Sequence, residues 1–156
     1  MVIATLYLIG LASGVAALWA DGIPFALPEA APILFRYFML LGVGLSLAIA
    51  CFGHVFASDR AAKRIGWPTG NPFQKELGYW DGAAGLAAML CFTHGPEFWL
   101  AVVIINAPFW AMAGLLHAVH IARYRNFNLD NALPAIANLA YAVTMVFLYL
   151  EAIGGY

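Results

Sequence analysis

Four residues form two pairs whose side chains and spacing suit metal chemistry. Cys51 and His54 lie three positions apart, and so do His117 and His120. Residues at i and i+3 share one face of a helix. Thiolate and imidazole groups are ligands for zinc and copper, so two such pairs on two helices would supply the four ligands of a tetrahedral site. The signal is weak, because true zinc motifs join closely spaced ligands by short loops.

Two carboxylates extend this candidate site. Glu76 and Asp81 open the apolar stretch that follows His54. Either acid could replace Cys51 as a ligand, or orient a ring nitrogen of a histidine. A haem with His54 and His117 as axial ligands is a further form of the hypothesis. The candidate metal ligands are therefore the following five residues: His54, His117, His120, Asp81 and Glu76.

Each of these residues also has a structural explanation. Ionisable side chains in membrane helices are costly and commonly pair with one another. Glu76 lies in a first turn, where the helix dipole favours a carboxylate. Asp81 lies about 7 Å further along the helix at 1.5 Å per residue, and we expect it to pair with His54 or His117. We favour structural pairing over a metal or haem site and over a proton or ion path.

The elements that must position these residues are too apolar for a soluble protein. Of the 156 residues, 64% are hydrophobic and 10% are charged, whereas soluble domains carry about 25% charged residues. A chain of this size lacks the interior volume to bury so much apolar surface, so we expect that surface to face lipid. The net charge of −1 and the absence of a basic stripe argue against a nucleic-acid partner.

Five apolar runs predict an all-α integral membrane protein, a bundle of five transmembrane helices in a single domain of residues 1–156. A spanning segment needs about 20 apolar residues, and only a helix satisfies its backbone in lipid. The predicted helices cover residues 2–20, 33–57, 77–93, 98–122 and 133–153. Pro24, Pro28 and Pro32 predict a stiff, non-helical first connection. Gly10 and Gly14 form a GxxxG pair that lets another backbone approach closely.

The distribution of basic residues predicts the orientation. Six of the seven Lys and Arg residues lie in the second and fourth connections, which the positive-inside rule places in the cytoplasm. The N-terminus is then cytoplasmic and the C-terminus outside, and we expect a multi-pass protein of the cell inner (cytoplasmic) membrane. In this arrangement all five candidate ligands fall in the cytoplasmic leaflet.

The second connection, residues 58–76, is predicted to form a cytoplasmic cap. Gly and Pro alternate from Gly66 to Pro72, which excludes a regular helix. Trp67 and Phe73 are too apolar to project into water. We therefore expect the cap to rest over the histidine and acid cluster. An interfacial anchor without a lid role is the alternative, because aromatic residues are common at this depth.

This segment also carries a family resemblance. The motif positions are Gly53-His54, Ile65-Gly66-Trp67-Pro68, Asn71-Pro72-Phe73-Gln74, Glu76, Gly78, Gly114, His117, Asn126-Phe127 and Asn131. Over this half of the chain the sequence resembles a family of small bacterial and archaeal membrane proteins defined only as a domain of unknown function. The resemblance implies a helical membrane fold and no activity. Asp81 stands where that family often has Asn, and Cys51 where it usually has a large apolar residue, which weakens a metal site built on Cys51.

These observations predict an accessory or structural subunit of a larger membrane assembly, with other membrane subunits or copies of itself as partners. Short loops, small-residue helix faces and the lack of a soluble domain favour this role. The alternative is a metal- or haem-binding redox or transport protein that uses the histidine and acid site. An enzyme with Asp81 or Glu76 as base is the third hypothesis. The sequence offers no nucleophile, phosphate loop or substrate pocket, so we expect no catalytic activity of its own.

Overall fold

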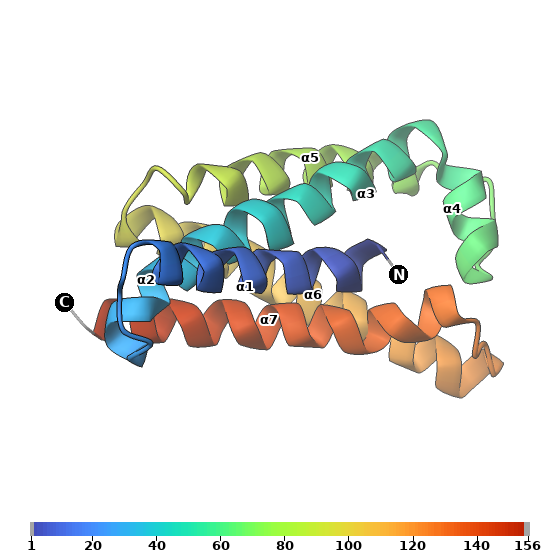
Figure 1. Cartoon of the computed structure of the whole chain (residues 1–156). Coiled ribbons are helices and arrows are strands. Elements are labelled where there is room, and N and C mark those ends of the chain that lie inside the picture. The colour runs from blue at the N-terminus through green and yellow to red at the C-terminus, as the bar shows by residue number, and fades with distance from the viewer. Residues whose placement is uncertain (1, 155–156) are drawn as a thin grey trace.

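The computed structural model describes residues 2–154, and within that range it contains helices and no strand. Met1, Gly155 and Tyr156 belong to the predicted domain but lie outside the described residues. Figure 1 shows the long helices side by side in one bundle, with the short helix α4, Ser58–Ile65, across one end. We call this end the cap end. Four helices are long and apolar enough to cross a membrane: Val2–Ala20, Leu27–Phe56, Pro96–Tyr124 and Leu129–Gly154.

Helix α1, Val2–Ala20, turns its glycine face into the bundle. Both Gly10 and Gly14 are buried. A Cβ atom at Gly10 would lie 2.9 Å from the backbone nitrogen of Gly42, closer than real Cβ contacts. At Gly14 it would lie 3.0 Å from a methyl carbon of Leu34. The GxxxG pair therefore serves packing inside the chain, where it lets α1 approach the second span closely.

The second span is continuous from Leu27 to Phe56 and consists of α2 (Leu27–Tyr37), a π-helical segment η1 (Phe38–Gly44) and α3 (Leu45–Phe56). The prediction of a non-helical connection as far as residue 32 is wrong, because Pro28 and Pro32 both lie within α2. Pro28 lies in the first turn, where its missing N–H would have no helical partner. Pro32 removes one hydrogen bond from the helix without ending it.

A buried tyrosine joins several helices near the middle of the bundle. Tyr141 lies on α7, Leu129–Gly154, and is 0% exposed. Its hydroxyl lies 2.9 Å from the Ser46 hydroxyl, and it donates toward the carbonyl oxygens of Ile3 at 3.0 Å and Gly42 at 3.2 Å. The ring stacks on Trp110 at 4.4 Å between centroids. This arrangement fixes α1, η1, α3, α7 and the helix of Trp110, α6 (Pro96–Tyr124), together. It also gives the hydroxyl hydrogen-bond partners that lipid could not supply.

The third predicted helix differs from the structure at both ends. Residues 58–72, which we call the cap segment, begin with a helix that the sequence reading missed, α4 (Ser58–Ile65), and continue as a loop. Helix α5 follows as Phe73–Leu90 rather than residues 77–93. It is not among the four helices apolar enough to cross a membrane, because its 18 residues include three charged side chains, Lys75, Glu76 and Asp81.

In each of two antiparallel helix pairs, glycines let the two helices approach each other closely. Helix α6, Pro96–Tyr124, packs along α7, and a Cβ atom at Gly114 would lie 3.1 Å from the carbonyl oxygen of Ala135. Helix α5 packs along α3 in the same way. There a Cβ atom at Gly85 would lie 3.0 Å from the Cβ atom of Leu47. These close approaches bring the polar side chains of neighbouring helices within hydrogen-bonding distance near the cap end.

Candidate functional site

His54 and Asp81 form a short polar contact between α3 and α5. The Nδ1 atom of His54 lies 2.7 Å from Oδ2 of Asp81, and Asp81 is only 1% exposed. A carboxylate so deeply buried needs a hydrogen-bonded or charged partner. Gly78 brings the two helices close enough, because a Cβ atom there would lie 3.0 Å from the Cβ of His54. The prediction that Asp81 pairs with one of two histidines is confirmed for His54.

The cap segment is held against α6 and α7 through Trp67. Its indole Nε1 donates to Oδ1 of Asn131 at 3.0 Å, and Nδ1 of His117 lies 2.9 Å from the same oxygen. The Nδ2 of Asn131 donates to the carbonyl oxygen of Asn126 at 3.0 Å, which fixes the orientation of the amide. Because an amide oxygen only accepts, His117 carries a proton on Nδ1 in this contact.

Trp67 also covers both histidines of α6. Its ring centroid lies 5.1 Å from that of His117 and 5.0 Å from that of His120, at interplanar angles of 37° and 34°. Ring contacts at this separation stabilise the fold by more than the burial of their apolar area alone. The predicted cap therefore lies over these two histidines through one indole ring, while the hydrogen bond to Asn131 sets where that ring lies.

A second asparagine joins the connection between α6 and α7 to the turn after α4. The Nδ2 of Asn126 donates to the carbonyl oxygen of Ile65 at 2.7 Å and lies 3.3 Å from Nδ1 of His120. The turn at Gly66 has a φ of +75°, which disfavours residues with a side chain. A Cβ atom there would also lie 2.8 Å from the Asn126 amide nitrogen. Both the positive φ and the close Asn126 amide favour glycine at residue 66.

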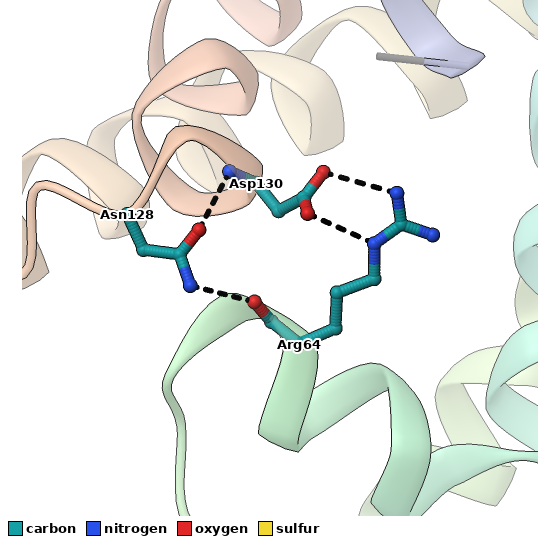
Figure 2. Close-up of polar contacts among 3 residues, drawn as sticks. All are labelled: Arg64, Asn128 and Asp130. Carbon is teal, nitrogen blue, oxygen red and sulfur yellow. Dashed lines mark hydrogen bonds and ion pairs between the residues drawn. The ribbon is translucent and has the colours of Figure 1, made fainter.

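Figure 2 shows the third contact of the cap segment, which is more exposed. Arg64 Nε and Nη2 donate to the two carboxylate oxygens of Asp130 at 2.9 and 3.3 Å. Asn128 donates to the carbonyl oxygen of Arg64 at 2.8 Å and accepts from the backbone N–H of Asp130 at 3.0 Å, which caps α7. The hydrogen bonds from Arg64 to Asp130, and then the carboxylate's charge, raise the pKa of the Arg64 guanidinium. An exposed pair of this kind sets the position of the segment more than it stabilises the fold.

An open groove of about 610 Å³ lies between the cap segment and the end of α6. Its lining combines aromatic, aliphatic and basic side chains. The lining residues are Gly66, Trp67, Pro68, Leu116, Val119, His120, Arg123 and Tyr124. The guanidinium carbon of Arg123 lies 5.5 Å from the centre of the Tyr124 ring. The groove can therefore accept a ligand that is apolar at one end and anionic at the other.

The five predicted metal ligands do not form one described cluster. His54 and Asp81 pair with each other, His117 and His120 lie beneath Trp67, and Glu76 is exposed in the first turn of α5. Within residues 2–154, no group of three or more His, Cys, Asp or Glu side chains is placed to hold a metal ion. Metal and haem binding therefore stay predictions, without an assembled set of ligands in the described part of the chain.

Sequence reasoning missed the role of three asparagines where the connection after α6 leads into the first turn of α7. Asn126, Asn128 and Asn131 each bond the cap segment or its partners through the side-chain amide. The polar run of residues 125–131 carried a signal, since Asn side chains commonly bond nearby backbone and cap helices. What the run could not reveal is that these amides bond a segment about 60 residues earlier in the chain.

Comparisons with known proteins bear on the family and not on the activity. Comparison with curated proteins and with solved structures found no match. One family model matches residues 1–153, a longer range than the 53–131 over which the motif resemblance extends. Because the match covers nearly the whole sequence, the chain belongs to the family of unknown function DUF6790.

Proposed function

We propose that the chain is a five-helix integral membrane protein of the cell inner membrane, acting as an accessory or structural subunit of a larger membrane assembly. Four helices already meet the length and composition of membrane spans. For the fifth, α5 has 18 residues, which extend about 27 Å against a hydrocarbon core of about 30 Å. Its Lys75 and Glu76 are exposed in the first turn, and Asp81 is paired with His54, which lowers the cost of crossing.

The proposed orientation has the cap end in the cytoplasm. The basic residues of α4, of the first turn of α5 and of the end of α6 all belong to this end of the bundle. The positive-inside rule places basic residues in the cytoplasm, so their location at the cap end supports a cytoplasmic cap. Five crossings then put the start of α1 in the cytoplasm and the end of α7 outside, consistent with their positions at opposite ends in Figure 1.

The observation that carries the subunit role is a face of small residues on α1. A shallow apolar groove of about 390 Å³ runs along α1 beside α7 and is lined by Ala4, Thr5, Leu8, Ile9, Ala12 and Leu133. Ala12 and Ala16 are both exposed and lie one turn apart. Small residues at this spacing let a second membrane helix approach closely. The partner we propose is a transmembrane helix of another subunit or of a second copy.

The internal contacts strengthen this interpretation. The buried glycines of α1 already pack against the second span, so the exposed face of small residues on α1 is a separate surface. The histidines and Asp81 are engaged by neighbouring side chains within the chain. A chain whose histidines and Asp81 near the cap end bond to its own helices and connections, with an outer face of small residues, fits a packing subunit better than a transporter or an enzyme.

Photo-crosslinking in native membranes tests the proposal. A benzophenone amino acid replaces Ala12 in the α1 groove, and in a control it replaces Leu86, which is 59% exposed on α5. We expect position 12 to give an adduct of fixed mass whose second component, identified by peptide mass spectrometry, is a membrane-spanning chain. Position 86 should give none. Equal adducts from both positions, or none from position 12, would contradict a partner on α1.

A further inference from the structure

We infer that the groove beside the cap segment binds an anionic phospholipid, with the phosphodiester headgroup beside Arg123 and an acyl chain along Leu116 and Val119. This inference rests on the proposed membrane embedding, with the cap end at the headgroup level. It adds a ligand site to the proposed packing role. The groove is on α6, whereas the proposed subunit contact is on α1, so the two can be tested separately.

The lining of the groove changes from apolar to basic along α6. Leu116 and Val119 are 54% and 48% exposed, and His120 and Arg123 follow on the same helix face. From residue 116 to residue 123 the helix rises about 10 Å. A phospholipid changes in the same direction, from an apolar acyl chain toward the bilayer core to an anionic headgroup at the surface. A soluble anion would have no use for the apolar half.

The walls of the groove are held in place by other contacts. On one side Trp67 and Pro68 extend from the cap segment, and Trp67 is fixed by its hydrogen bond to Asn131. On the other side the Arg123 guanidinium lies against the Tyr124 ring. At about 610 Å³ the groove is of the size that accepts a small ligand. Aromatic rings at the interface and an arginine beside them suit a phospholipid headgroup.

Charge complementarity selects an anionic lipid. Arg64, on the same end of the molecule, is neutralised by Asp130. Among residues 2–154, Arg123 forms no ion pair with a carboxylate, and the groove lining contains no acid. A basic side chain near a membrane surface favours anionic over zwitterionic lipid by about fivefold. We therefore expect phosphatidylglycerol to bind in preference to phosphatidylcholine.

Native mass spectrometry of the detergent-purified full chain tests the lipid site. The protein is titrated with phosphatidylglycerol and with phosphatidylcholine, and retained lipid is counted for the wild type and three variants. Arg123→Gln should lower the affinity for phosphatidylglycerol by about fivefold. Val119→Trp should block the groove and reduce retention of both lipids. Arg60→Gln removes an equal charge outside the groove and should leave retention unchanged. Circular dichroism establishes that each variant keeps its helices.

Each of the following results would overturn the inference. Equal losses for Arg60→Gln and Arg123→Gln would mean that diffuse surface charge, not the groove, attracts the lipid. Unchanged retention by Val119→Trp would mean that the lipid lies elsewhere. If the wild type is recovered in the membrane fraction but shows no preference for phosphatidylglycerol, the lipid site is wrong and the proposed function stands. If the chain is not recovered in membranes, the proposed function itself fails.

Discussion

The imidazole of His54 and the carboxylate of Asp81 are joined at 2.7 Å across the α3–α5 interface, where the carboxylate is 1% exposed. This pair accounts for an acid that the apolar environment would otherwise reject. Together with the contacts of Trp67 and Asn131, it assigns the polar residues near the cap end to holding helices and cap in position.

Breaking the His54–Asp81 pair should destabilise the fold, and removing both partners should restore much of the loss. His54→Leu leaves a buried carboxylate without a partner and should lower the free energy of unfolding by about 2 kcal/mol. The double variant His54→Leu with Asp81→Leu should lie closer to the wild type, because no unpaired charge remains. Unfolding in mixed micelles followed by circular dichroism measures both. A double variant less stable than the single one would contradict a purely structural pair.

The indole N–H of Trp67 should secure the cap segment. Trp67→Phe keeps an aromatic ring over His117 and His120 but removes the donor to Asn131, at a cost of about 1 kcal/mol. We expect faster hydrogen exchange of backbone amides in residues 66–72, with little change in the long helices. Trp19→Phe is the matched control, because Trp19 is 86% exposed. Unchanged exchange in Trp67→Phe would show that ring contact alone holds the cap.

The glycine face of α1 should tolerate no added methyl group. Gly10→Ala places a Cβ atom 2.9 Å from the backbone of Gly42 and should destabilise the protein by about 1–3 kcal/mol. Gly53→Ala is the control, since nothing lies within 4 Å of its added Cβ atom and alanine favours helix. Thermal unfolding of the two variants should therefore shift in opposite directions. Equal stability would mean that α1 does not pack as described.

Cysteine labelling should reveal whether α5 crosses the membrane. In a background with Cys51→Ala and Cys91→Ala, single cysteines replace Thr69 in the cap segment or His94 after α5, both of which are exposed. With a membrane-impermeant maleimide on intact cells, His94→Cys should react, and Thr69→Cys should react only after permeabilisation. If both positions react from the same side, α5 does not span the bilayer and the five-helix topology is wrong.

Composition made the helical membrane class predictable, because 10% charged residues cannot cover a soluble protein of this length. The partner of Asp81 was also predictable, because histidines were the expected partners at its depth in the helix. Pro32 led to the wrong prediction of a non-helical first connection, because packing can maintain a helix through one lost hydrogen bond. Helix α4 was missed because a short charged helix has no apolar run to signal it.

The remaining features depend on tertiary contacts that no local pattern encodes. The hydroxyl of Tyr141 finds its partners on another span, at Gly42 in the π-helical segment and at Ser46 just after it. Asn131 was recognisable as a motif position, yet its role follows from Trp67 and His117 meeting at one oxygen. The sequence separation between these residues hides the contact until the helices are placed.

The mass and composition of the particle extracted in mild detergent test the subunit role most directly. We predict that the 16.8 kDa chain migrates on a native gel as a stoichiometric complex with other membrane-spanning chains or copies of itself. Ala12→Trp, which fills the α1 groove, should release it as a monomer, and Leu86→Trp on α5 should not. A stable wild-type monomer, unaffected by either substitution, would contradict the account.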